Sequence, residues 1–360
     1  MKTRSCLLFC WIILFVFTAC APETAPTAST SPGSLPTSTS QPTATDISSS
    51  PTPLTTATAQ PTATDISSSP TPLATATAQP TATLTPVPTP DFMKEAKVGD
   101  YTLTLACMGS GSPTIILENG LENVSWDNAS LARISPLTRT CTYLRAGMGP
   151  NDPKPEHIRT TADQVDDLHT LLQSTGVSGP YILVGHSIGA WNALYYTYRY
   201  PDEVVGVVFV DGAPAGWQQI YLDKFNSAGK GIEYMNGIQK WAVRYLERDP
   251  DAIFSGNQEN VDVRESEKLI LKVTSIGDIP LRLLVAPPPA HSPIFFDGNS
   301  WDVLNGWLWE SSVLEADMNF LKLSTRPKLI AVPSTDHGTI VKAREVWEQI
   351  SEVFQLVKMH

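Results

Sequence analysis

The sequence predicts an α/β protein with a mostly parallel central sheet flanked by helices. From about residue 96 onward, short apolar runs alternate with amphipathic stretches. This alternation is typical of parallel strands joined by helices. The run Val204–Val210 (VVGVVFV) is apolar throughout and rich in β-branched residues, as expected for a strand that is buried on both faces.

The other strands and the helices follow from their hydrophobic periodicity. Further strands are predicted at Tyr101–Cys107, Thr114–Glu118, Thr140–Ala146, Tyr181–Val184, Leu281–Val285 and Lys328–Val332. Helices are predicted at Thr160–Ser174, at Ile188–Tyr200 and from about Val341 to Val357. We expect Thr161 and Gln164 to form a capping box at the start of the first helix, and Pro201 to end the second.

Two segments interrupt this alternation and are predicted to be inserts. Residues 212–279 carry helical patches such as Gly237–Glu247 and few strand signals, so we interpret them as a helical lid between two strands. Residues 286–326 are rich in tryptophan and show no clear period. We treat them as a second, late insert without an assigned element.

The first 19 residues have the pattern of a signal peptide. Lys2 and Arg4 precede a short apolar run of about a dozen residues, Cys6–Phe17. Small residues then lead to Cys20, which we predict to be lipidated. An uncleaved anchor or an ordinary cleaved signal are the alternatives. All three place the rest of the chain outside the cytoplasm, and lipidation would attach it to the cell membrane.

Residues 20–91 are predicted to be a disordered linker. They consist largely of Pro, Thr, Ser and Ala, and the segment Gln41–Ala59 recurs almost unchanged as Gln60–Ala78. This 19-residue repeat has almost no apolar face to bury, which excludes a solenoid. The remaining residues, 92–360, are long enough for a single domain with its own core.

The charge and motif content of the sequence exclude several partners, and the cysteines indicate a disulfide. The formal net charge is −11, which makes nucleic acid a poor partner, because phosphate binding needs clustered Lys and Arg. We find no zinc pattern and no phosphate-binding loop, so we expect neither a metal nor a cofactor. In an exported protein, Cys107 and Cys141 suggest one disulfide, with two buried thiols as the alternative.

The strongest local motif is Gly185-His186-Ser187-Ile188-Gly189, which follows the strand YILV and opens a helix. This is the context of a nucleophile elbow. The sharp turn leaves little room near the serine, and the flanking Gly185 and Gly189 supply that room. We therefore expect Ser187 to be an exposed nucleophile.

A nucleophilic serine needs a base and an acid, and where this elbow occurs their order along the chain is serine, acid, histidine. His337 lies in the segment Pro333–Gly338, just after the last predicted strand, and is the predicted base. The predicted acid is Asp211, at the end of the strand VVGVVFV, with Asp297 second and Asp302 third. We expect the backbone amides of Ile188 and Leu121 to form the oxyanion hole.

From about Tyr101 to Val357 the chain resembles the α/β-hydrolase superfamily, especially its exported esterase-like and proline-iminopeptidase-like members. The resemblance rests on the segments Glu118–Gly120, Arg145–Gly149, Pro180–Ala190, Arg199–Pro214 and Ser334–Gly338. It implies an α/β-hydrolase fold with Ser187 as nucleophile, His337 as base and an acid at Asp211 or in the late loop. Related exported sequences often carry a similar cysteine pair.

Three positions depart from the family pattern. Leu144 stands where many members have Asp, Ala190 replaces a glycine, and no carboxylate directly follows the strand LRLLV. We predict a serine hydrolase that acts on an ester or related carbonyl of a small acyl substrate. The alternative is a non-catalytic, hydrolase-like binding module on the cell surface.

Overall fold

Eight strands form one sheet in the computed structural model, which describes residues 88–149, 153–228, 242–244, 246–247, 257–287 and 300–359. The strands are β1 (Phe92–Val98), β2 (Tyr101–Met108), β3 (Thr114–Glu118), β4 (Thr140–Tyr143), β5 (Tyr181–His186), β6 (Val204–Val210), β7 (Leu281–Val285) and β8 (Pro327–Ala331). Their order is β1-β2-β4-β3-β5-β6-β7-β8. The β1–β2 and β2–β4 pairs are antiparallel and the others are parallel. The predicted α/β fold is confirmed.

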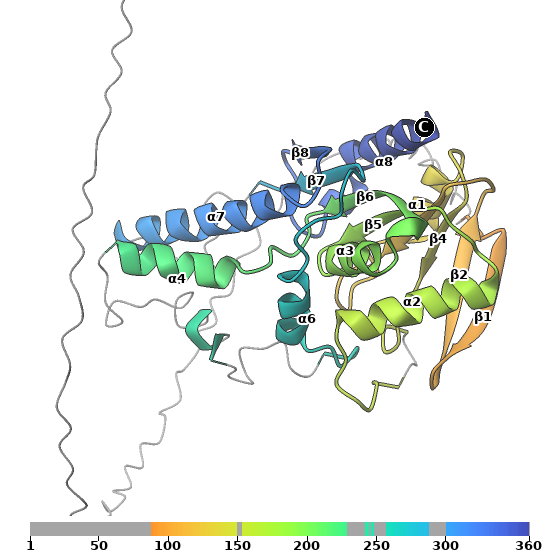
Figure 1. The fold of residues 1–360 in the computed structure, drawn as a ribbon, viewed down its shortest axis with the longest axis horizontal. Helices are drawn as coiled ribbons and strands as arrows, with labels where there is room; N and C mark the ends of the chain where they lie inside the picture. Colours follow the sequence, from red (N-terminus) through yellow and green to blue (C-terminus); the bar gives the residue numbers. More distant parts are fainter. Residues whose placement is uncertain are drawn as a thin grey trace, which may run out of the picture. The chain divides into compact units, whose positions relative to one another are not determined.

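Helices cover both faces of this sheet (Figure 1). They are α1 (Asn128–Ile134), α2 (Thr161–Thr175), α3 (Gly189–Arg199), α4 (Trp217–Ser227), α6 (Val263–Ile270), α7 (Ser300–Leu321) and α8 (Arg344–Lys358), with 3-10 turns η1 (Pro201–Glu203) and η3 (Ile340–Lys342). One hydrophobic core lies under α2 and α3, and a second lies under α1 and α8. Both cores use the buried strands β3, β5 and β6, whose alternate side chains point to opposite faces.

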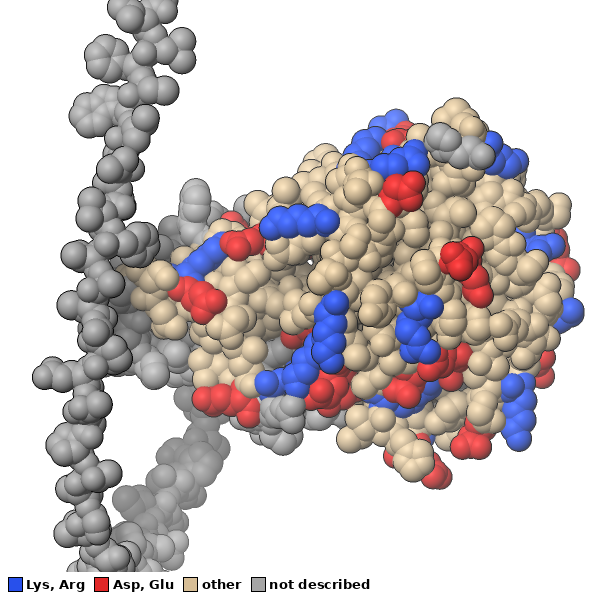
Figure 2. Space-filling model, in the orientation of Figure 1, with Lys and Arg blue, Asp and Glu red and all other residues tan. Residues whose placement is uncertain are grey.

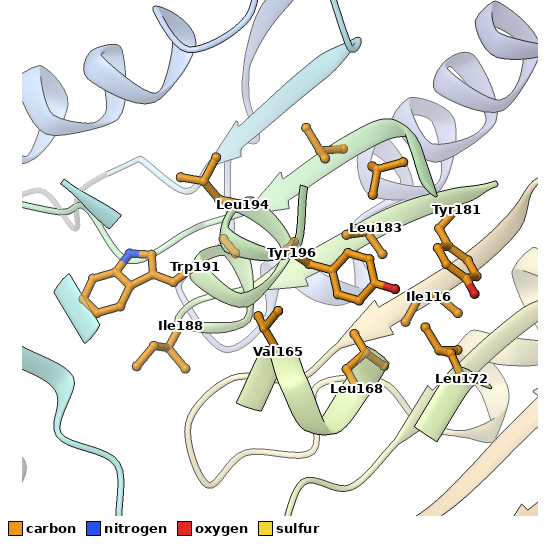
Figure 3. Packing of buried hydrophobic residues seen from close by; sticks show 14 of the residues in the cluster. Ile116, Val165, Leu168, Leu172, Tyr181, Leu183, Ile188, Trp191, Leu194 and Tyr196 are labelled. Carbon is orange, nitrogen blue, oxygen red and sulfur yellow. The ribbon is translucent and has the colours of Figure 1, made fainter. Parts of the chain in front are cut away.

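The core under α2 is built from apolar residues that recur at helical spacing. Val165, Leu168 and Leu172 lie on one face of α2 and are fully buried. They share a cluster with Leu183 of β5 and Tyr196 of α3 (Figure 3). This packing fixes α3, and with it the turn that connects β5 to α3.

Each of the two predicted inserts contributes a helix, and these helices, α4 and α7, run side by side (Figure 1). Helix α7 occupies most of the late insert, to which we assigned no element. The prediction failed there because α7 has apolar residues around its circumference, without the one-sided period of a surface helix. Most of the patch Gly237–Glu247 lies outside the described residues.

Two predicted details at helix starts are wrong. The capping box of α2 is formed by Thr160 and Asp163, because the N-cap lies one residue before the predicted one: Asp163 accepts from the Thr160 amide over 2.7 Å. The last helix begins at Arg344, because Ala343 has an extended backbone, and Val341 belongs to the 3-10 turn before it.

Cys107 and Cys141 face each other across β2 and β4 and form a disulfide. Both residues are buried. The predicted pairing is thus present. It joins β2 to β4, the strand at which the sheet changes from antiparallel to parallel pairing.

Basic and acidic side chains are interspersed over the face seen in Figure 2. This agrees with the mixing of acidic and basic residues along the sequence of residues 92–360. Among the described helices, none is long and apolar enough to cross a membrane.

Candidate active site

Ser187 lies at the sharp turn between β5 and α3, with a φ of 54°. This left-handed conformation is strained for a residue with a side chain, and such residues gather at functional sites. A Cβ atom on Gly189 would lie 2.5 Å from the carbonyl oxygen of Asn119, and one on Gly185 would clash with the backbone of Gly189. Close backbone approach therefore leaves no room for a side chain at either glycine.

The structure brings Ser187, His337 and Asp211 into one hydrogen-bonded chain. The Oγ of Ser187 lies 3.0 Å from Nε2 of His337, and Nδ1 of His337 lies 2.6 Å from Oδ2 of Asp211. Because a carboxylate only accepts, Nδ1 carries the proton, and Nε2 is left to accept from the serine hydroxyl. This is the arrangement that activates a serine as a nucleophile.

The backbone holds Asp211 in place at the end of β6. Its φ is 46°, its amide donates to Leu284 O over 2.7 Å, and its Oδ1 accepts from the Ala286 amide over 2.8 Å. Of the alternative acids, Asp297 lies outside the described residues. Asp302 belongs to α7, but its side chain is not described.

Asp336, although adjacent to the histidine, serves its own loop. Its carboxylate accepts from the amides of Gly338 and Thr339 and from the Thr339 hydroxyl. These hydrogen bonds lower the pKa of Asp336. They also shape the turn that presents His337.

The predicted oxyanion loop, residues 119–121, lies directly against Ser187. A Cβ on Gly120 would be 3.4 Å from the Cβ of Ser187. Within the described residues, the amides of Leu121 and Ile188 donate no hydrogen bond. Both predicted donors therefore remain available to an oxyanion.

A buried arginine fixes the backbone of the oxyanion loop through hydrogen bonds. Arg145 donates from Nη1 to Asn119 O and from Nη2 to Gly120 O, both over 2.8 Å. Its Nε lies 2.6 Å from Oε2 of Glu259, and its Nη1 lies 3.1 Å from Oε2 of Glu118. All three charged side chains are fully buried, so the loop rests on a network shielded from water.

In this network, burial and ion pairing shift the pKa of each charged group in opposite directions. Burial raises the pKa of Glu118, and the nearby Arg145 opposes that rise. Burial would lower the pKa of Arg145, but the Glu259 carboxylate raises it above its ordinary value. Glu259 belongs to the last part of the predicted lid and also accepts from the Glu122 amide over 2.7 Å. The lid segment is thereby joined to the oxyanion loop.

His186, the residue before Ser187, joins the two loops around the site. Its Nε2 lies 2.8 Å from His337 O, so Nε2 carries the proton. Its Nδ1 then accepts from the hydroxyl of Ser125 over 2.7 Å, and Ser125 accepts from the Gly120 amide over 3.1 Å. Burial, followed by the neighbouring His337, lowers the pKa of His186 to about 4.

A cavity of about 700 Å³ adjoins the hydrogen-bonded chain. Its wall is mostly apolar, and its lining includes Asp211, Trp217, Trp309, Leu314, Asp317 and His337. Burial, and then the nearby Asp211, raise the pKa of Asp317 to about 7. Of the described residues that line it, none is Lys or Arg.

The described residues contain no cluster of three or more His, Cys, Asp or Glu side chains placed to hold a metal ion.

A family model described as "alpha/beta hydrolase fold" matches residues 113–258. That range includes strands β3 to β6, the elbow and Asp211, and the sheet around it has the order given above. The chain belongs to the α/β-hydrolase superfamily. The sequence resemblance is confirmed at this level.

Curated relatives match this α/β-hydrolase over part of their length. It is 37% identical over 111 residues to a "probable transporter" of Hormonema carpetanum, covering 29% of this chain and 15% of that protein. It is 32% identical over 121 residues to the 2-(acetamidomethylene)succinate hydrolase of Mesorhizobium japonicum, covering 34% of this chain and 43% of that protein. The chain spans less than two thirds of these relatives.

Among solved structures, the alpha/beta hydrolase domain-containing protein 10 from mouse is similar with a TM-score of 0.49 and 16% identity. The match covers 74% of this α/β-hydrolase and 99% of the mouse chain.

Sequence reasoning missed the residues that support the site. Ser125, Glu259 and Asp317 stand in no motif, and the contacts of Ser125 with His186 and of Glu259 with Arg145 join distant parts of the chain. Glu259 and Arg145 are 114 positions apart. His186 lay within the elbow motif, but its contacts depend on loops 61 and 151 positions away.

Proposed function

We propose that this α/β-hydrolase is a serine hydrolase of carboxylic esters or related carbonyl compounds. The single observation that carries the proposal is the hydrogen-bonded chain from Ser187 through His337 to Asp211. Its geometry matches the roles of nucleophile, base and orienting acid. The family alone would not suffice, because one fold hosts many activities.

In the proposed mechanism, His337 removes the proton of Ser187 as Oγ attacks the substrate carbonyl. The amides of Ile188 and Leu121 stabilise the oxyanion that develops in the tetrahedral intermediate. His337 then protonates the leaving alcohol, and an acyl-enzyme ester remains on Ser187. Water, activated by the same histidine, attacks this ester and releases the acid.

We further propose that the enzyme acts outside the cytoplasm, attached to the membrane through a lipid on Cys20. This rests on the apolar leader of residues 1–19 and the Pro/Thr/Ser-rich linker of residues 20–91, all of which lie outside the described residues except 88–91. Palmitate labelling should be lost in Cys20→Ala. Labelling that persists in this variant would contradict the lipid anchor.

A fluorophosphonate probe tests the catalytic proposal, because it reacts with activated serines. We expect the full-length protein to be labelled, Ser187→Ala to lose labelling, and His337→Ala to lose most of it. Ser178→Ala is the control, since Ser178 is an exposed loop residue before β5, at the opposite end of the strand from Ser187. A folded protein that shows no labelling and hydrolyses no ester would favour the binding-module alternative.

A further inference from the structure

Asp317 is a buried carboxylic acid without a partner among the described residues. It lies on α7, its side chain lines the cavity beside Asp211 and His337, and the residue is 7% exposed. Within the described residues it has no hydrogen-bond or ion-pair partner. Buried carboxylates are normally paired, because an isolated one costs several kcal/mol. A carboxylate left open toward a cavity therefore points to a ligand that pairs with it.

The charges around Asp317 are of one sign. Along α7, Glu310 and Asp317 line the same cavity, and Asp211 faces them from the end of β6. Asp336 contributes a fourth carboxylate from the loop after β8. His337 is the one described side chain of the lining that can carry positive charge, and its Nδ1 already pairs with Asp211. The cavity thus favours a positive group.

The remainder of the wall is suited to an apolar part of the same ligand. Trp217 of α4 and Trp309 of α7 line the cavity together with Leu314. Tryptophan contacts alkyl groups and also attracts cations through its ring face. The cavity therefore combines apolar area, aromatic rings and an unpaired carboxylate.

We propose that this cavity binds a cationic ammonium group of the substrate, with Asp317 as its counter-ion. This inference rests on the proposed function and narrows it: the preferred substrate is an ester with a quaternary or protonated amine on a short apolar chain. Asp317 is a specificity-determining residue here and takes no part in bond breaking.

Binding is tested with two ligands of the same shape and different charge. Butyrylcholine is cationic, and 3,3-dimethylbutyl butyrate is its neutral counterpart, with carbon in place of nitrogen. Both are titrated into the full-length Ser187→Ala protein in nonionic detergent at pH 8 and low salt, with affinity measured by calorimetry. We expect butyrylcholine to bind at least tenfold more tightly.

Two variants test whether Asp317 causes the preference for butyrylcholine. Asp317→Asn keeps the size of the side chain and should reduce the preference to less than threefold. Glu315→Gln removes one charge from the same helix, but Glu315 is half exposed and pairs with Lys224 outside the cavity lining, so the preference should persist. Equal affinity for both ligands, no binding of either, or a preference kept in Asp317→Asn would overturn the inference.

Turnover of the same two esters by the protein with Ser187 intact separates this inference from the proposed function. A kcat/KM at least tenfold higher for butyrylcholine, lost in Asp317→Asn, would support both. Equal hydrolysis of the two esters would overturn the cation site and leave the hydrolase. Selective binding of butyrylcholine without hydrolysis of either ester would support the cation site and contradict the hydrolase.

Discussion

His186 donates a hydrogen bond from Nε2 to the backbone carbonyl oxygen of His337, 2.8 Å away. Through Nδ1 the same ring accepts from Ser125, whose oxygen accepts from the Gly120 amide. One directed chain of hydrogen bonds therefore runs from the oxyanion loop to the backbone of the proposed base. The residue next to the nucleophile fixes the distance between the two loops that must act on one substrate.

We predict that His186→Phe lowers kcat about 10- to 100-fold and leaves KM nearly unchanged. Phenylalanine keeps the ring that packs beside His337 but loses both hydrogen bonds, and small misplacements of catalytic groups are costly. Steady-state kinetics and the rate of fluorophosphonate labelling measure the effect. The control is His169→Phe, because His169 stacks on Tyr200, away from the site. Unchanged kcat in His186→Phe would show that these hydrogen bonds of His186 have no positioning role.

Protonation of His186 should also contribute to acid sensitivity. Burial, together with His337, lowers its pKa from 6.5 to about 4, so the unfolded state binds this proton more readily. The contribution of His186 to the free energy of unfolding therefore rises with pH between about 4 and 6.5, and it falls as the solution is acidified. The full effect is roughly 3 kcal/mol. Urea unfolding at pH 4.5 and 7 should show a smaller difference for His186→Phe than for the parent.

Asp211→Asn should lower kcat by about 10³- to 10⁴-fold, because an asparagine cannot hold His337 in the tautomer that accepts from Ser187. Asp297→Asn and Asp302→Asn are the matched controls, and we expect each to stay within about threefold of the parent on this reasoning. Esterase kinetics on the three variants decide the assignment. A larger loss in Asp297→Asn than in Asp211→Asn would move the acid to the late insert.

The sequence predicted those features that one short segment determines. The elbow depends on five consecutive residues, Asp211 directly follows β6, and His337 lies in the loop after β8. Parallel strands bring their carboxyl ends together, so the pattern indicated Ser187 and His337 and offered Asp211 as the first of three candidate acids.

The remaining features depend on contacts between distant segments. Arg145 could be noted as part of a family motif, but its partner Glu259 comes from an insert with no recognisable pattern. Helix α7 has no single apolar face, because it packs against α4 on one side and contributes Phe320 to the core on another. Asp317 therefore gave no signal in the sequence.

Glu259→Gln should destabilise the fold and the oxyanion loop together. It leaves Arg145 buried with one carboxylate instead of two, and breaking a buried pair costs about 3 kcal/mol. We expect a lower free energy of unfolding, measured in urea, and a reduced kcat. The control Glu348→Gln breaks an exposed pair with Arg344 and should cost less than about 0.5 kcal/mol. Equal effects of the two variants would contradict a special role for the buried network.

Asp317→Asn should stabilise the ligand-free protein at alkaline pH while it removes the preference for cations. Burial and Asp211 raise the pKa of Asp317 from 3.8 to about 7, so the folded state keeps a proton that the unfolded state has already lost. The contribution of Asp317 to stability therefore falls as pH rises from about 4 to 7.

Above pH 7, Asp317 is ionised without a partner, and replacing it with asparagine should raise the free energy of unfolding by about 2–4 kcal/mol. The gain should shrink toward zero near pH 4 and should also shrink when saturating butyrylcholine is added to the Ser187→Ala background, because the ligand stabilises the parent alone. Asp211, Glu310, Asp336 and His337 also face the cavity and are present in both proteins, so most of their own contribution cancels in this difference. Urea unfolding at pH 4, 6 and 8 measures it. A gain that is independent of pH would mean that Asp317 stays protonated and is no counter-ion.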